Sequence, residues 1–389
     1  MKDFSLKVWN IVYIAIVAAI LIFPTILVKL RPGLHVDNRV AAEFPALSID
    51  NISDFPRQFE SWFNDRIGGR DVFLAMGNYL IFQIFHESPG KQVLVGRDGF
   101  LFLASHHDGK DNFNSLIWSY FKFDQDRVKE SANDFISLLS ELEKSPIHVL
   151  FFSVPTKHLL YFDKMPSFIA DEIPDSRRVW TTEVINEIIR LRPDAARFLV
   201  DIRPEAERVS SNVQLIPPGN FHWVPGPYTH LAANIIARKF GVASEIYVPK
   251  SDDYRLIKDK YSDLKQFIYP WLRTPALMTL NDDFSRMGIV TAASNAVEVC
   301  TFNPSAKGGR ILLIGDSFTL PLGQDMARYF REVISIEHTE VERREGKSIA
   351  EKAMRQLIAA WNPEYIVVIS HFDACAWGRT VAAMLAERE

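Results

Sequence analysis

Cysteine and clustered positive charge are both scarce in this sequence. Only Cys300 and Cys375 occur among 389 residues, and neither stands in a CxxC or Cys/His spacing of the kind that binds zinc. One disulfide and two separate thiols both remain open. The formal net charge is -4, and no run of lysine and arginine with interleaved aromatic residues is present. The sequence therefore predicts no nucleic acid partner and implies no metal or organic cofactor.

Charge is also missing from the segment Val8 to Val28, which is long enough to cross a bilayer as a helix. The segment runs into Lys29 and Arg31 and not into the small-residue pattern of a cleavage site, which favours an uncleaved anchor. Positive residues stand on both sides of it, so the positive-inside rule gives no orientation. We predict an N-terminal transmembrane helix within residues 1–28 that inserts in the lipid bilayer.

The next region, residues 29–91, is predicted to be a helical linker region that packs on the main domain. Apolar residues recur at helical spacing from Phe55 to Phe85, with a break at Gly68 and Gly69, which indicates two short amphipathic helices. The stretch QVLVGRDGFLFL follows, and its two apolar runs around a glycine-flanked turn predict a β-hairpin.

From residue 92 to residue 389 the periodicity alternates between strand and helix. We predict helices over 124–144, 181–191, 320–330 and 348–361, and strands over 147–155, 197–202, 310–315, 332–338 and 364–370. Strands alternating with helices are typical of a parallel sheet covered by helices on both faces. The chain is therefore predicted to hold one α/β domain over 92–389, in which residues 247–300 form a long, poorly patterned insertion.

One serine stands where such a sheet places reactive groups. In GGRILLIGDSFTLPLG, Ser317 follows an apolar strand and precedes a helix, and the carboxyl ends of parallel strands are where ligands bind. Ser317 is therefore a candidate nucleophile. The same position also suits a serine that only caps a helix, and Asp316 beside it fits a cap or turn residue.

A serine nucleophile needs a base, and histidine is the usual one because its pKa lies near neutral pH. His222 lies in PPGNFHWVPGPYTHLAANIIA, where a loop rich in proline and glycine precedes an apolar helix. Catalytic groups concentrate in loops that rigid elements hold in place. The alternative is a histidine packed beside Trp223 with its nitrogens bonded to backbone groups.

Several short motifs, taken in order, resemble the SGNH-hydrolase-like family of the alginate O-acetyltransferases AlgJ and AlgX, also described by a DHHW-type motif. They are the N-terminal anchor, DNRVAAEFPAL, NDRIGGRD, VGRDGFLFL, VPTKHLLYFDKMP, FHW before a helix, and GDSF. The resemblance implies an SGNH-like parallel sheet flanked by helices. It also implies that Ser317 is the acyl-accepting nucleophile and His222 its general base, while GRDG and PTK are fold elements.

The sequence departs from the family pattern DxHW at one position, where Asn220 replaces the aspartate. An asparagine can orient the imidazole of His222, as in Cys-His-Asn sites, but it adds no charge. Another carboxylate could instead serve, and Asp373 in ISHFDACAW, at the carboxyl end of the last strand, is the candidate. Its neighbour His371 could replace His222 as base. The alternative for Asp373 and His371 is that they are polar residues that merely end a strand.

Together these features predict a membrane-anchored O-acetyltransferase that acts on an extracytoplasmic polysaccharide through an acyl-enzyme on Ser317. Backbone N–H groups at the start of the following helix would bind the oxyanion. The resemblance places the main domain in the periplasm, anchored in the inner membrane, and implies a membrane-bound partner protein that donates the acyl group. Two alternatives stay open: an esterase or deacetylase with the same site, and a catalytically impaired scaffold in a polysaccharide biosynthesis or secretion complex.

Overall fold

A computed structural model describes residues 12–14, 42–46, 53–64, 70–105, 115–173, 175 and 178–385. The anchor predicted over Val8 to Val28 lies outside these residues, apart from a helical fragment at 12–14. In the described part of the chain, no helix combines the length and the apolar character that a membrane crossing requires. The anchor therefore stays a prediction from the sequence.

The central sheet has seven strands in the order β4-β3-β11-β9-β10-β8-β7. In chain order the strands are β3 (His148–Ser153), β4 (Leu199–Val200), β7 (Val290–Ser294), β8 (Glu298–Phe302), β9 (Gly308–Gly315), β10 (Phe330–Glu337) and β11 (Tyr365–Ser370). The five strands from β4 to β10 pair in parallel, whereas β8 and β7 join antiparallel at one edge. The predicted parallel α/β sheet is confirmed for those five strands. The antiparallel edge was not predicted.

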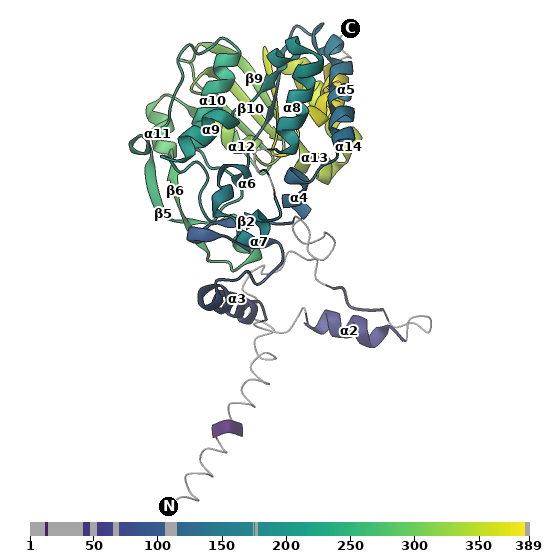
Figure 1. The fold of residues 1–389 in the computed structure, drawn as a ribbon, viewed down its shortest axis with the longest axis vertical. Helices are drawn as coiled ribbons and strands as arrows, with labels where there is room; N and C mark the ends of the chain where they lie inside the picture. The colour runs from purple at the N-terminus through teal and green to yellow at the C-terminus, as the bar shows by residue number, and fades with distance from the viewer. Residues whose placement is uncertain are drawn as a thin grey trace, which may run out of the picture.

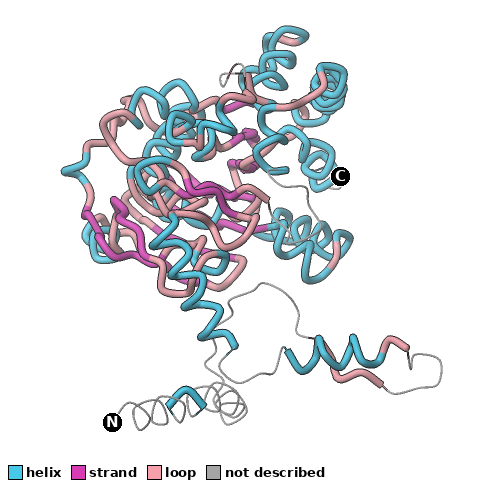
Figure 2. The backbone as a smooth tube through the Cα atoms, turned by 60° about the horizontal axis from the view of Figure 1, so that its bottom comes forward, coloured by secondary structure: helices cyan, strands magenta, loops and turns pink. Residues whose placement is uncertain are grey.

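Side chains of each parallel strand alternate between two cores because successive residues of a strand point to opposite faces. On β9, Ile311 and Leu313 belong to one core and Leu312 and Ile314 to the other. The helices α10 (Pro227–Lys239) and α12 (Thr319–Met326) cover the first face, and α5 (Gln125–Leu142), α8 (Trp180–Leu191) and α14 (Lys347–Trp361) cover the second. Figure 1 shows these two helical layers around β9 and β10, and Figure 2 shows helices surrounding the strands of the α/β body.

Most predicted elements are confirmed with shifted ends. The helix α5 begins after Asp124, whose side chain accepts a hydrogen bond from the backbone N–H of Asp126 and so caps the helix. The helix predicted over 320–330 ends early at Met326, because the buried Phe330 already begins β10. The strand predicted over 197–202 has only two residues, since a 3-10 helix from Pro193 to Phe198 precedes it.

The remaining elements lie around this body. They are α2 (Phe55–Asn64), α3 (Arg70–Leu80), the π-helix η3 (Ile81–Phe85), the hairpin β1 (Val93–Val95) and β2 (Leu101–Leu103), α4 (Ser115–Phe121), α6 (Lys157–Leu160), α7 (Ser167–Ala170), α9 (Arg203–Ser210), the pair β5 (Arg255–Tyr261) and β6 (Arg273–Met278), α11 (Asn281–Arg286), α13 (His338–Glu345) and α15 (Gly378–Leu385). The predicted hairpin is confirmed, because Val93 pairs antiparallel with Leu103. The region predicted as an unpatterned insertion contains β5, β6, α11, β7 and the first part of β8.

Gly315 ends β9 opposite Ile369 of β11, and a Cβ there would overlap the backbone carbonyl of Ile369. We expect Gly315→Ala to lower the free energy of unfolding by about 1–3 kcal/mol, because a clash with backbone forces the two strands apart. Denaturant unfolding followed by circular dichroism measures this loss. Gly77→Ala in α3 is the matched control, because a Cβ at Gly77 meets nothing within 4 Å and alanine favours helix. Equal stability of both variants would contradict the close approach.

Candidate active site

Ser317 and His222 lie in hydrogen-bond contact at the carboxyl edge of the sheet. Ser317 follows the last residue of β9 by two positions and precedes α12, and its Oγ lies 2.7 Å from Nε2 of His222. His222 comes from the loop before α10, 95 residues earlier in the chain. The imidazole of His222 is about one-third exposed at 32%, so the pair is open to a substrate. The structure thus brings together the two residues that the sequence singled out as nucleophile and base.

The other nitrogen of His222 binds a carboxylate that the sequence did not indicate. Nδ1 of His222 lies 2.8 Å from Oδ2 of Asp263, and the backbone N–H groups of His222 and Phe221 donate to the same carboxylate at 2.9 and 2.8 Å. Burial favours the neutral acid, but these donated hydrogen bonds outweigh it and lower the pKa of Asp263.

The charge state of Asp263 fixes the tautomer of His222. An ionised carboxylate can only accept hydrogen bonds, so Nδ1 of His222 carries the proton and donates it to Asp263. In the neutral imidazole Nε2 is then an acceptor, and the hydroxyl of Ser317 donates to it. This is the arrangement in which a histidine can take the proton of a serine nucleophile.

Asn220 does not occupy the position behind His222 that the sequence analysis gave it. Its side chain is 2% exposed, and its Oδ1 accepts a hydrogen bond from the backbone N–H of Asp263 at 3.2 Å. Asp263 takes the role that the sequence analysis gave to Asn220, because the carboxylate of Asp263 holds the imidazole directly. Asn220 therefore orients the loop that carries Asp263.

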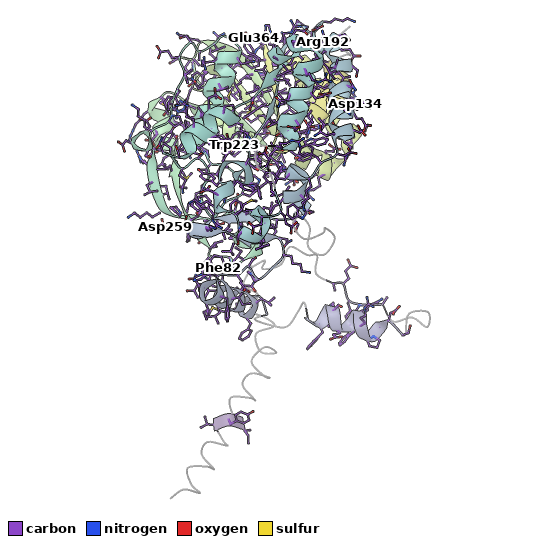
Figure 3. All side chains as sticks on the ribbon, viewed as in Figure 1. Phe82, Asp134, Arg192, Trp223, Asp259 and Glu364 are labelled. Carbon is purple, nitrogen blue, oxygen red and sulfur yellow. The ribbon has the colours of Figure 1, made fainter. Side chains whose placement is uncertain are left out.

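Two further contacts fix the loops that carry the serine and the histidine. The indole Nε1 of Trp223 donates to the carbonyl of Phe318 at 2.8 Å, which joins the residue after His222 to the residue after Ser317. Figure 3 shows Trp223 inside the α/β body. The buried Nζ of Lys157 donates to the carbonyls of Pro218 and Leu101 at 2.7 Å each, and burial lowers the pKa of Lys157 to about 7. The PTK stretch thus holds the histidine loop against the hairpin.

His371 forms a second imidazole–carboxylate pair beside Ser317. Its Nδ1 and its backbone N–H both lie 2.7 Å from Oδ2 of Asp316. Burial opposes ionisation of Asp316, yet the charge and hydrogen bonds of His371 outweigh it and lower the pKa of Asp316. His371, considered as an alternative base, is thus paired with Asp316, while the nitrogen in contact with the Ser317 hydroxyl belongs to His222.

Asp316 also changes the expected source of the oxyanion donors. The backbone N–H of Phe318 donates to Oδ1 of Asp316 at 3.0 Å, and that of Thr319 donates to the Asp316 carbonyl at 2.9 Å. These two groups at the helix start are therefore already engaged, contrary to the prediction. The backbone N–H of Ser317 has no hydrogen-bond partner among the described residues, which makes it the available donor nearest the nucleophile.

Asp373 lies in a different environment from the one predicted for a catalytic acid. Its carboxylate is 4% exposed and accepts hydrogen bonds from Nε1 of Trp180 at 3.0 Å and from the backbone N–H of Cys375 at 2.9 Å. Burial raises the pKa of Asp373, which favours its neutral form. Asp373 therefore closes the turn after β11 and packs that turn on α8, and it is Asp263 that holds His222.

Sequence reasoning missed Asp263 because it stands 41 residues after His222, in a region without clear periodicity. The one available signal was indirect: Asn220 in the DxHW position indicates that a carboxylate must come from elsewhere.

Within the described residues no group of three or more His, Cys, Asp or Glu side chains could hold a metal ion. Cys300 and Cys375 are separate free thiols.

Comparison with solved structures finds several proteins of similar fold. PatB1 of Bacillus cereus is 15% identical, with a TM-score of 0.45, over 74% of this chain and 96% of that one. The O-acetyltransferase domain of AlgJ from Pseudomonas putida is 15% identical, with a TM-score of 0.40, over 76% and 99%. AlgX of Pseudomonas aeruginosa is 14% identical, with a TM-score of 0.42, over 73% of this chain and 62% of its own length. No protein-family model and no curated protein sequence matches the chain.

The carboxylate of Asp263 is testable by exchanging acid and amide at two positions. We expect Asp263→Asn to reduce turnover of an acyl ester by about 10⁴-fold, the loss that the equivalent change produces in serine proteases, because the imidazolium loses its counter-charge and the neutral imidazole is no longer held in the correct tautomer. We expect Asn220→Asp, in contrast, to give no gain, since it adds a second carboxylate beside one that already serves. Steady-state kinetics of both variants decide the matter. Higher activity of Asn220→Asp would restore the role that the sequence analysis gave to position 220.

Asp373 gives a stability prediction with a defined pH dependence. Its pKa is raised in the folded state, so its contribution to stability is complete below the unfolded pKa of about 4 and falls as the pH rises through the folded value. Asp373→Asn loses one acceptor, which costs roughly 1 kcal/mol. We expect the stability difference between wild type and variant to shrink from pH 4 to pH 7, as measured by urea unfolding, with kcat unchanged. A constant difference, or a loss of kcat in a folded variant, would contradict this assignment.

Proposed function

We propose that this protein is an O-acyltransferase that works through an acyl-enzyme on Ser317. The observation that carries the proposal is the unbroken chain of hydrogen bonds from Ser317 through His222 to the ionised Asp263. This chain connects a nucleophile, a base and an orienting anion at the edge of the sheet where ligands of α/β proteins bind.

In the first half of the reaction, Oγ of Ser317 attacks the carbonyl carbon of the donor ester while its proton moves to Nε2 of His222. Asp263 stabilises the resulting imidazolium through Nδ1–H, and the Ser317 N–H is positioned as one donor to the oxyanion. The tetrahedral intermediate then expels the donor alkoxide, which takes the proton from His222. Ser317 is left as an acyl ester.

In the second half, an acceptor hydroxyl attacks that ester and His222 takes the proton of the hydroxyl. Collapse of the second intermediate forms the product ester, and the proton returns from His222 to Oγ of Ser317. Water in place of the acceptor hydroxyl would make the protein an esterase with the same residues. The two reactions therefore differ only in what reaches the acyl-enzyme.

The finer assignment follows the resemblance of the sequence motifs to the alginate O-acetyltransferases. We infer an SGNH-like fold, an acetyl group as the acyl group, an extracytoplasmic polysaccharide as acceptor, and a membrane-bound protein as donor. The uncharged segment Val8 to Val28 supports anchorage in a membrane, and the family resemblance is the reason to infer the inner membrane with the main domain in the periplasm. The alternative of a catalytically impaired scaffold depended on the presence of Asn220 where the family pattern has an aspartate. The contact of Asp263 with His222 weakens the case for that alternative, because it supplies a carboxylate.

Replacement of the nucleophile tests the proposal. We expect Ser317→Ala to lose nearly all acyl transfer and still unfold near the wild-type temperature, because its side-chain hydroxyl is hydrogen-bonded to His222 within the site itself. The full chain is assayed for acetyl transfer from a nitrophenyl ester to an oligosaccharide, and mass spectrometry detects acetyl on Ser317. Ser137→Ala on the exposed surface of α5 is the matched control.

Each outcome of this experiment points to a different reaction. Undiminished transfer by folded Ser317→Ala would contradict the acyl-enzyme. Release of nitrophenol together with an acetylated Ser317, but without product on the oligosaccharide or on any other sugar tested, would indicate an esterase. A wild-type chain that neither releases nitrophenol nor acquires acetyl on Ser317 would favour the scaffold.

A further inference from the structure

The helix formed by α3 and η3 presents an exposed apolar surface to its surroundings. Residues 72–85 include no Asp, Glu, Lys, Arg or His. Large side chains in this stretch are nevertheless exposed, with Phe73 at 58%, Ile84 at 61% and Phe85 at 66%. An apolar surface of this kind on a protein marks an interaction site, since solitary apolar residues are common at surfaces but contiguous ones are not. We call residues 72–85 the apolar helix.

One narrow side of the apolar helix is docked on the α/β body. Tyr79 and Phe82 pack on Tyr269, with ring centroids 5.3 and 5.7 Å apart, and Nε2 of Gln83 donates to the Tyr269 hydroxyl at 3.3 Å. Figure 3 places Phe82 at the lower end of the body, where Figure 1 shows α3. This docking fixes the helix to the domain and determines which of its sides remains outside.

The exposed apolar positions cover more than half of the circumference of the apolar helix. At about 100° per residue in α3, an arc of roughly 200° is occupied in turn by Val72, Met76, Leu80, Phe73 and Leu74. All five are exposed. A helix that is apolar all round is normally surrounded by protein or by lipid. Here the uncovered side is convex and has no polar stripe along it.

We propose that the apolar helix inserts in the interfacial layer of a lipid bilayer. A fluid layer of acyl chains can cover a convex apolar surface on every side, whereas a single protein partner would need a groove around more than half a helix. The same chain holds the uncharged segment Val8 to Val28, and only 43 residues separate that segment from Val72. Insertion of that segment would tether the apolar helix to a bilayer.

The apolar helix also contacts the segment that carries the proposed acid. Tyr269, on which Tyr79 and Phe82 pack, follows Asp263 by six residues, with the buried Leu264 and Ile268 between them. A helix that lies in the bilayer interface would therefore hold the Asp263 segment close to the membrane surface. This inference is independent of the proposed acyl transfer, because it depends only on the apolar surface.

Spin labels that report depth in a bilayer test the proposal on the full chain. The chain carries Cys300→Ser, while Cys375 stays because it is buried, and single cysteines are introduced by Phe73→Cys and Phe85→Cys. Lys352→Cys on the exposed side of α14 is the matched control. Each labelled chain is reconstituted in vesicles of phosphatidylcholine and phosphatidylglycerol, and its collision rates with oxygen and with a water-soluble nickel chelate are measured.

We expect labels at positions 73 and 85 to collide more with oxygen and less with the chelate than the label at position 352, because oxygen concentrates in acyl chains and the chelate stays in water. Chelate collisions equal to those at position 352 would overturn the proposal, since the helix would then face water. Shielding from both reagents would also overturn it in favour of a second copy of the chain. A chain that does not float with the vesicles would likewise contradict it.

Discussion

The hydrogen bond between Asp263 and His222 is the interaction on which the candidate site depends. Without a carboxylate at Nδ1 the imidazole could adopt either tautomer, and Nε2 would not always be free to accept the proton of Ser317. Asp263 remains ionised despite its partial burial because two backbone N–H groups and the imidazole donate to it. Backbone groups that are fixed by the fold thus determine the protonation state of a side chain in the site.

Buried polar contacts, together with apolar packing, fix the loops at this edge of the sheet. Lys157 binds the carbonyl of Pro218, and the hydroxyl of Ser262 binds the carbonyl of Gly219, so the histidine loop is held from two sides. Buried donors that lose their partners cost more free energy than the same bonds contribute when formed. The network therefore permits few alternative positions of the loop, and so fixes the separation between His222 and Ser317.

Much of the fold could be predicted because strand and helix periodicity is a local property of the chain. Residues 311–314 of β9 are all apolar, which indicates that both faces of this strand are buried, and they do alternate between the two cores. The strands β7 and β8 escaped prediction because all five residues of β7 are exposed and only Thr301 of β8 is buried, which leaves little of a buried face for the sequence to signal. The end of α12 was misplaced for a related reason: the apolar residues up to Phe330 fit a helix, but Phe330 is buried as the first residue of β10.

The sequence by itself determined where a strand, a turn and a helix present Ser317, and that a loop rich in proline and glycine presents His222. Only the tertiary structure decided which carboxylate binds that histidine. The sequence favoured Asp373, at the end of a strand, and gave no sign of Asp263, yet Asp373 accepts from Trp180 in a buried turn and Asp263 accepts from His222. The reason is physical: a side chain's partners depend on contacts between segments distant along the chain, and the local pattern of residues carries no record of those contacts.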